Sequence, residues 1–277
     1  LERTITRALD VRSLVENPQT SRIIGAIEHL PSAPSLFHEL SELLADEQVH
    51  VEAVAQLLES DAALTAKVLQ LVNSAFYGLP RKVDCVARAV TLLGLTGVRD
   101  LVLTVEGLGS FDKVVDTAAI EEVRSRCLHV ASLAQHLASG RDAKAQAFST
   151  AMLSEVGVLA IVATAPRWYR SLQREAKSSG VTIASLQERE LGTTHHGIGA
   201  YLLGLWGLPE EMVHAVHSYG APTGTTLDLT GILHVASTLV RQRFGEPVTL
   251  DPTFVAAAGI TEDIEGWRQW QPEEQAA

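Results

Sequence analysis

The sequence predicts an all-α fold, and three observations carry this prediction. Apolar residues recur at i, i+3, i+4 and i+7 in several segments, which places one apolar stripe on one face of each expected helix. Aromatic residues, which are common in strands, make up only 5% of the 277 residues. No segment shows the sustained apolar–polar alternation of a half-buried strand. We therefore expect a multi-helix bundle.

The periodic segments give the order of the expected helices. They comprise residues 51–58, 68–75, 86–93, 98–105 and 127–134. Asp61 and Asp84 are expected N-caps, because a short acidic side chain accepts hydrogen bonds from the free backbone N–H groups of a helix start. Gly78, Pro80 and Gly94 are expected to interrupt helices, because glycine and proline continue them only at a cost.

Residues 147–165 (AFSTAMLSEVGVLAIVATA) are apolar on nearly every side, which predicts a buried central helix. Glu155 is the only charged residue in this segment. A buried carboxylate needs a partner or a raised pKa. Two interpretations stay open: Glu155 reaches the edge of a subunit, or it faces a basic side chain inside the bundle.

Composition limits the class of protein. Acidic residues outnumber basic ones 33 to 22, and the resulting net charge of −11 disfavours nucleic acid and anionic membranes as partners. Cys85 and Cys127 are the only cysteines, too few for a disulfide framework. No apolar run reaches the roughly 18 residues of a membrane span. We therefore expect a cytoplasmic protein.

Several segments suggest how the chain is organised. Residues 1–22 predict an amphipathic helix, either an ordinary packing helix or a connector from an upstream domain. Residues 106–116 and 220–226 are expected boundaries, and the polar tail 271–277 is expected to fray. The chain begins without methionine, so we expect a piece of a longer protein.

Ten histidines raise the question of a metal site, but the sequence contains no HExxH or CxxC motif. It also contains no P-loop and no GxSxG motif. We expect the histidines to be structural or solvent-facing. The closely spaced pairs are His195 with His196, His214 with His217, and His129 with His136.

Five segments in order resemble the HDOD family, the HD-related output domains of bacterial signalling proteins. They are residues 30–44 (LPSAPSLFHELSELL), 61–78 (DAALTAKVLQLVNSAFYG), 86–103 (VARAVTLLGLTGVRDLVL), 148–162 (FSTAMLSEVGVLAIV) and 188–216 (ERELGTTHHGIGAYLLGLWGLPEEMVHAV). The resemblance implies an HDOD domain over residues 22–222. Its N-terminal helical part would span 22–112 and a degenerate HD-like part 113–222. A connector helix (1–21) would precede the domain, and a C-terminal helical extension (223–277) would follow it.

The resemblance also allows the metal ligands of HD phosphohydrolases to be sought one by one. In that superfamily, a His on one helix and an adjacent His-Asp on the central helix hold the first metal. Aligned with the family, these positions fall on Arg126 and on Ser154-Glu155, whereas His196 keeps a family histidine. The resemblance thus implies a vestigial metal site at Arg126, Ser154, Glu155 and His196, with no metal and no cofactor.

The later histidine positions of the superfamily fall near Tyr219 and Gly220. We expect Arg126 and Glu155 to form an ion pair that fills the space of the lost metal, because arginine stays charged and offers a planar fork of donors. Arg124 is the alternative partner if the alignment is off by one turn.

The function that the resemblance implies is that of a non-catalytic output domain of a response regulator, acting through protein–protein interaction. A phosphorylated receiver domain would control it, and a homodimer stays open. Asn73, Ser74 and Tyr77 are candidates either for a hydrogen-bond network that joins the two helical parts or for an interaction surface.

Three other functions stay open. A divergent metal-dependent phosphohydrolase for a nucleotide or cyclic dinucleotide would need His195, His196, His214 or His217 together with Glu155 or Glu190. A nucleotide sensor would bind without hydrolysis. A DNA-binding regulator would need a basic face, for which the densest candidate is Arg167, Arg170, Arg174 and Lys177.

Overall fold

The computed structural model describes residues 18–25, 34–46, 48–74, 77, 79–107 and 117–271. Within these ranges every regular element is a helix, which confirms the predicted all-α fold. Residues 1–17 of the predicted connector, Gly78, residues 108–116 of the predicted boundary and the tail after residue 271 lie outside the described part.

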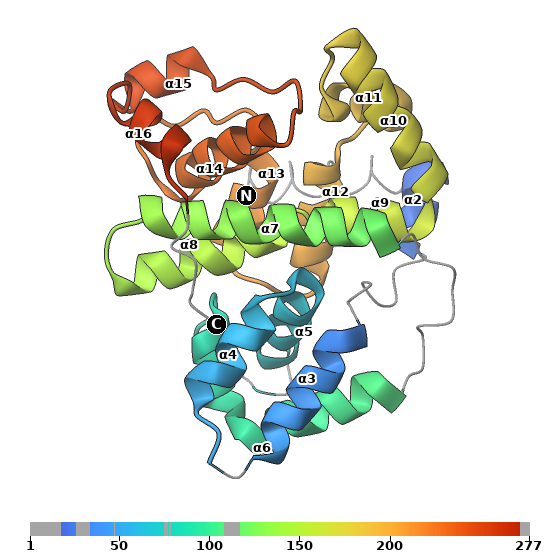
Figure 1. The fold of residues 1–277 in the computed structure, drawn as a ribbon, viewed down its shortest axis with the longest axis vertical. Coiled ribbons are helices and arrows are strands. Elements are labelled where there is room, and N and C mark those ends of the chain that lie inside the picture. Colours follow the sequence, from blue (N-terminus) through green and yellow to red (C-terminus); the bar gives the residue numbers. More distant parts are fainter. Residues whose placement is uncertain are drawn as a thin grey trace.

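A first group of helices forms one end of the molecule (Figure 1). It contains α3 (Pro34–Ala45), α4 (Val51–Glu59), α5 (Ala62–Val72) and α6 (Val86–Gly107). The first three of these helices pack against α6. The short helix α2 (Pro18–Gly25) precedes them in sequence but packs against helices of the second group, α9 and α12.

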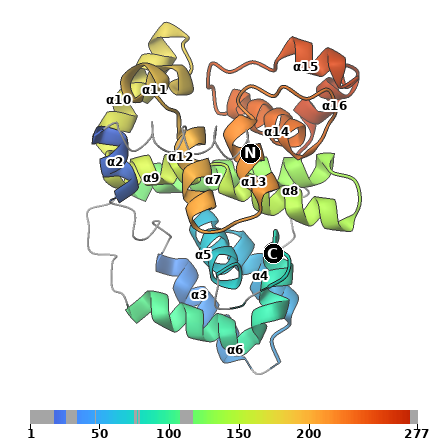
Figure 2. The same cartoon turned by 180° about the vertical axis from the view of Figure 1, so that it is seen from behind.

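The second group comprises α7 (Thr117–Leu137), α8 (Arg141–Leu153), α9 (Val156–Thr164), α10 (Pro166–Ser179), α11 (Ile183–Leu191), α12 (His195–Leu205), α13 (Glu210–Ser218), α14 (Leu229–Arg243), α15 (Pro252–Ala257) and α16 (Asp263–Gln269). Helix α7 crosses the middle of the molecule and packs along α8 and α14 (Figures 1 and 2). Helix α12 packs against α9 and α13, and α5 joins the two groups by packing on α8.

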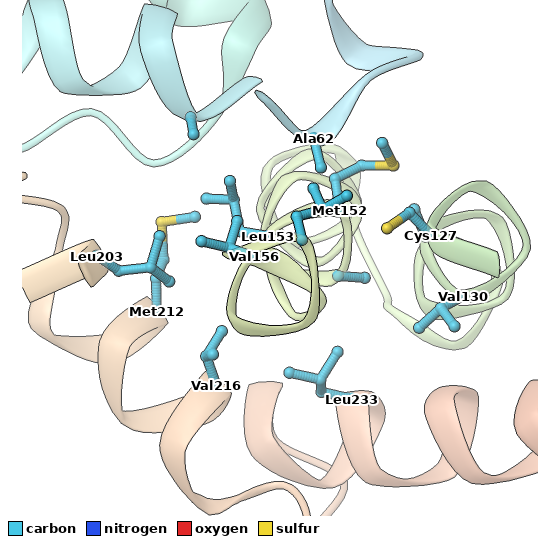
Figure 3. Close-up of a cluster of buried hydrophobic side chains, with 14 of the residues drawn as sticks. Ala62, Cys127, Val130, Met152, Leu153, Val156, Leu203, Met212, Val216 and Leu233 are labelled. Atoms are coloured by element: carbon cyan, nitrogen blue, oxygen red, sulfur yellow. The ribbon is translucent and has the colours of Figure 1, made fainter. Parts of the chain in front are cut away.

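The core of the second group lies around the junction of α8 and α9. Figure 3 shows Met152, Leu153 and Val156 at this junction, all fully buried. Apolar side chains of the surrounding helices lie around them: Cys127 and Val130 from α7, Leu203 from α12, Met212 and Val216 from α13, and Leu233 from α14. The junction is therefore enclosed on several sides.

The predicted central helix is buried as expected, but it is not continuous. Helix α8 ends at Leu153 and α9 begins at Val156. Glu155, at the break, has φ −95° and ψ 4°, outside the helical range. Apolar periodicity could not locate this break, because the residues on both sides of it are buried.

The expectation that no segment suits a membrane span is wrong for residues Arg141–Thr164. By length and composition this stretch could cross a membrane. In the fold, however, 83% of its most apolar window is buried inside the protein. The stretch therefore has the placement of a core element.

The predicted helix starts and stops are partly confirmed. Asp61 caps α5, since its carboxylate accepts the backbone N–H of Leu64 at 2.9 Å. Asp84 does not cap α6, which begins two residues later; its carboxylate lies 2.9 Å from Arg88 instead. Gly94 interrupts α6 as predicted, with a φ of 66° that favours glycine.

Helices α9 and α12 approach each other closely at Gly157. A Cβ atom at this position would lie 1.9 Å from the carbonyl oxygen of His195, a distance that no real contact allows. The contact is between backbones, so no flexible side chain could yield. Gly157 therefore sets the spacing that brings the start of α12 to the α8–α9 junction.

Gly157→Ala is expected to lower the free energy of unfolding by about 1–3 kcal/mol, because the added methyl group forces the two backbones apart. Gly266→Ala in α16 is the matched control, since a Cβ there meets nothing within 4 Å. The control should be neutral or stabilising by about 0.5–1 kcal/mol. Urea denaturation measures both, and equal effects would contradict this role of Gly157.

Candidate functional site: a buried ion cluster

Arg126 on α7 and Glu155 at the α8–α9 break form the predicted ion pair. Nη2 and Nε of Arg126 donate to Oε2 of Glu155, at 2.7 and 3.2 Å. Glu155 is fully buried and Arg126 is 1% exposed. Glu155 therefore faces the interior, and the interpretation that it reaches a subunit edge is wrong. Arg124, the alternative partner, contacts Glu121 and the carbonyl of Ser60 instead.

A second arginine reaches the same carboxylate from the other side. Arg241, near the end of α14, donates through Nη2 to the remaining oxygen, Oε1, of Glu155. Its Nη1 donates to Oε2 of Glu246 at 2.7 Å, and Oε1 of Glu246 lies 3.5 Å from Nη1 of Arg126. We call Arg126, Glu155, Arg241 and Glu246 the ion cluster. Its two positive and two negative charges balance.

The pKa values of the cluster show that each charge stabilises the ionised form of its partners. Burial by itself would raise the pKa of Glu155, but Arg126 and Arg241 outweigh burial and lower it to about 2. Burial would likewise lower the pKa of both arginines, yet the facing Glu155 leaves it raised. All three groups are thus charged at neutral pH.

His195 extends the network from the first turn of α12. Its Nε2 lies 3.2 Å from Nη2 of Arg241, and its Nδ1 lies 2.7 Å from Oε1 of Gln187. Because a guanidinium can only donate, Nε2 must accept and Nδ1 must carry the proton donated to Gln187. Burial lowers the pKa of His195 well below its ordinary value, which keeps the ring neutral.

His196 lies beside the ion cluster, but its ring is not arranged as a metal ligand. Its half-buried ring packs on Tyr219, with 4.2 Å between ring centroids. A Cβ atom at Gly220 would lie 2.7 Å from this ring, so the absence of a side chain there leaves room for His196. Burial, followed by the charge of Arg241, lowers the pKa of His196 to about 3.

The donors around Glu155 do not fit a divalent metal ion. Both carboxylate oxygens bind guanidinium groups, and the hydroxyl of Ser154 donates to the carbonyl of Ala151 at 2.7 Å. In the described ranges, no three His, Cys, Asp or Glu side chains are grouped so as to hold an ion. A metal site needs converging ligands that are anionic or neutral, and the vestigial positions offer a cation instead.

The other proposed ligands of a phosphohydrolase are not brought together. His214 and His217 are exposed on α13. Glu190 is exposed on α11, where it accepts the indole N–H of Trp168 at 2.7 Å. His129 and His136 pack instead against the rings of Phe244 and Trp270.

Comparison with known proteins identifies the family. The model of the HDOD domain matches residues 30–222. This chain belongs to the HDOD domain family. The fold agrees, because a solved chain of the MmoQ response regulator from Methylococcus capsulatus strain Bath matches with 27% identity and a TM-score of 0.67, over 88% of this chain and 100% of that solved chain.

Two further relatives extend the comparison of this HDOD chain. A virulence factor from Campylobacter jejuni shares the fold with a TM-score of 0.65 at 18% identity, covering 88% of this chain and 89% of its own. An uncharacterized protein of Treponema pallidum (strain Nichols) is 23% identical over 222 residues. That match covers 78% of this chain but 43% of the relative, so the chain spans less than half of that protein's length.

Arg241 and Glu246 were missed by the sequence analysis, and both lie beyond the matched HDOD residues. Helix α14 was assigned to a C-terminal extension, yet it packs along α7 and completes the ion cluster. A signal existed: Arg241 follows Ile232–Val240, which are all buried and mostly apolar. A charge at the end of such a face indicates a buried partner.

Asn73, Ser74 and Tyr77 lie at the end of α5. The side chain of Asn73 exchanges two hydrogen bonds with the backbone of Val83, at 2.7 and 2.8 Å. The backbone carbonyl of Asn73 accepts from Nζ of Lys82 at 2.7 Å. The carbonyl of Ser74 accepts the backbone N–H of Tyr77 at 3.2 Å. These bonds hold α5 to the segment before α6, within the first group.

Arg126→Met is expected to lower the free energy of unfolding by about 3–5 kcal/mol, because it removes one partner from a buried ionised carboxylate. The control is Arg88→Met, whose ion pair with Asp84 is half-exposed. An exposed pair contributes about 0–1 kcal/mol. Urea denaturation of both variants tests the difference. Similar losses of unfolding free energy would show that the buried ion pair stabilises the fold no more than the half-exposed one.

Acid is expected to lower stability in two overlapping ranges. The pKa of Glu155 falls on folding from 4.5 to about 2, so its contribution is complete above pH 4.5 and is lost as the pH falls toward 2. The pKa of His196 falls from 6.5 to about 3, so its contribution is lost as the pH falls from 6.5 toward 3.

The variant His196→Phe is therefore expected to reduce the loss of unfolding free energy as the pH falls from 6.5 to about 5.5, because Glu155 stays ionised in both the folded and the unfolded state over this range. Urea midpoints measured across this range for the wild type and the variant provide the test. Identical slopes would contradict a His196 that stays neutral in the folded state.

Proposed function

We propose that this chain is a non-catalytic output domain of a bacterial response regulator, which acts in the cytoplasm through contacts with a partner protein. One observation carries the proposal. The carboxylate of Glu155, which the family resemblance aligns with a metal ligand of HD phosphohydrolases, is bound on both oxygens by arginine. The residue types that would hold a metal and activate water are replaced by a closed set of ion pairs.

The ion cluster performs a structural task that a metal centre also performs. It joins three separate elements, namely α7 through Arg126, the α8–α9 break through Glu155, and α14 through Arg241. A divalent cation would meet two guanidinium charges at hydrogen-bond distance from the same carboxylate. The arrangement therefore supports a fold that keeps its shape without a metal or another cofactor.

The control of this domain by a receiver is part of the same proposal. The likeness to MmoQ, which is called a response regulator, supports it. In such a protein a phosphorylated receiver domain would act through the segment that precedes residue 22. Neither nucleic acid nor a membrane is required as a partner, and a homodimer is compatible with the scheme.

The test is the metal content of protein purified without chelator, together with hydrolysis of bis(p-nitrophenyl) phosphate in the presence of Mn²⁺. We expect no stoichiometric metal and no turnover above that of the buffer. Stoichiometric iron, manganese or zinc with turnover would overturn the proposal and favour the phosphohydrolase. The variant His214→Ala/His217→Ala separates ions held by exposed histidines from ions held at the cluster.

A further inference from the structure

Three buried polar atoms beside the ion cluster form no hydrogen bond with any residue that the structure describes. They are Oη of Tyr219, Oγ of Ser237 and Nε of Arg241, on side chains that are at most 5% exposed. A fourth such atom, Nε2 of Gln187, is not part of this set, because Gln187 binds the other ring nitrogen of His195. Each of the three can donate a hydrogen bond, and a buried donor without an acceptor destabilises a fold.

Printed contacts place these three side chains next to one another on α14. Ser237 and Arg241 are four residues apart on this helix, and His234 lies three residues before Ser237, so all three share one face. Nδ1 of His234 donates to the carbonyl oxygen of Tyr219 at 2.8 Å. This bond holds Tyr219 against the same face of α14, one turn before Ser237.

His196 closes the circuit from the start of α12. Its ring packs on the ring of Tyr219, with 4.2 Å between centroids, and on the ring of His195, with 4.1 Å. His195 in turn reaches Arg241, with 3.2 Å between Nε2 and Nη2. The donors of Tyr219, Ser237 and Arg241 therefore belong to one small region beside the ion cluster.

The charges that act on this region favour an anion over a cation. Burial raises the pKa of Tyr219; Arg241 opposes this rise more strongly than any other group, Glu155 adds to it, and Ser237 and Arg126 oppose it less. After burial, Arg241 is also the strongest influence on the pKa of His196, which it lowers. Both side chains thus respond more to the positive charge of Arg241 than to the negative charge of Glu155.

We propose that Tyr219, Ser237 and Arg241 form a binding site for a small oxyanion of the phosphate class, which the ring of His196 covers. Three neighbouring donors suit a tetrahedral oxyanion, because each can meet a different oxygen atom, and the guanidinium adds a charge-assisted bond. The site goes beyond the proposed function, since it adds a small ligand to a domain that acts by binding a protein.

The position of His196 suits a movable cover. Its ring is half-buried and lies between the buried Tyr219 and the exposed Gly220. Packing on Tyr219 and His195 positions the ring, and no hydrogen bond from a described residue holds it. The ring can therefore turn aside without breaking a hydrogen bond, which would uncover Tyr219.

The fold carries a cost at this site that an oxyanion would remove. Each of the three donors is shielded from water, so it has lost the hydrogen bonds that it makes in the unfolded chain. The oxygen atoms of a phosphate group would restore these bonds. Arg241 keeps its bonds to Glu155 and Glu246 in this arrangement, because they use its Nη atoms and leave Nε free.

The test follows the Nε–H signal of Arg241 in a ¹H–¹⁵N NMR titration with inorganic phosphate at constant ionic strength. The signal is assigned through the couplings of its own side chain. We expect a saturable shift with a Kd of about 1 mM or below. Tyr219→Phe/Ser237→Ala removes two donors and should weaken binding by about tenfold or more. The control Tyr201→Phe removes the hydroxyl of a half-buried tyrosine on α12 and should change Kd by less than about twofold.

Urea unfolding without phosphate separates a binding role of the Tyr219 hydroxyl from a structural one. Tyr219→Phe removes only an atom that has no partner, so the urea midpoint should stay equal or rise. If the hydroxyl were bonded to a buried water molecule and served the fold alone, the variant would unfold at a lower urea concentration. Weaker phosphate binding at equal or higher stability is therefore the expected combination.

Three results would overturn the oxyanion site: no saturable shift of the Arg241 signal, equal weakening by Tyr201→Phe, or a lower urea midpoint for Tyr219→Phe. A parallel titration with adenosine monophosphate distinguishes the sources of the phosphate group. Tighter binding than inorganic phosphate would assign the site to the phosphate group of a larger molecule, whereas equal or weaker binding would assign it to free phosphate.

Failure of the oxyanion site is distinct from failure of the proposed function. If phosphate does not bind while metal and turnover remain absent, only the oxyanion site is wrong. If stoichiometric metal and turnover appear, the proposed function falls whatever the phosphate titration shows.

Discussion

The fold of this HDOD domain depends on the neutralisation of one buried carboxylate. Glu155 has no exposed surface, and an ionised group in such a place is tolerated only when it is paired and hydrogen-bonded. Arg126 and Arg241 occupy its two oxygens, and Glu246 balances the second positive charge. These bonds hold α14 against α7, and they fix the carboxylate of Glu155 at the break between α8 and α9.

Under the proposed function, the cluster also accounts for how the core tolerates a carboxylate at a position that the family resemblance aligns with a metal ligand. Removing a metal and keeping a carboxylate would strand a negative charge in the core. Arginine at position 126 supplies the opposite charge, and its Nε and Nη2 both donate to one oxygen of Glu155 from a single planar group, which lysine does not have.

Of the four residues of the ion cluster, Arg126 and Glu155 could be predicted from the sequence. Glu155 was conspicuous as the only charge in residues 147–165, and the family resemblance placed Arg126 opposite it. Arg241 was not predicted, because its contact with Glu155 joins residues 86 positions apart and no local pattern encodes that distance. The break at Glu155 was missed for a related reason, since burial on every side removes the periodicity that marks a helix end. The wrong cap at Asp84 reflects competition from Arg88.

The central claim is that two arginines hold Glu155 ionised in the core, and the pKa of that carboxyl group measures it directly. A ¹³C NMR titration of the glutamate side-chain carboxyl signals, with Glu155 assigned by the signal missing in Glu155→Gln, would give this value. The account predicts a pKa of about 2. A pKa at or above the ordinary value of 4.5 would show that burial, and not the arginines, controls the group, and would contradict the account.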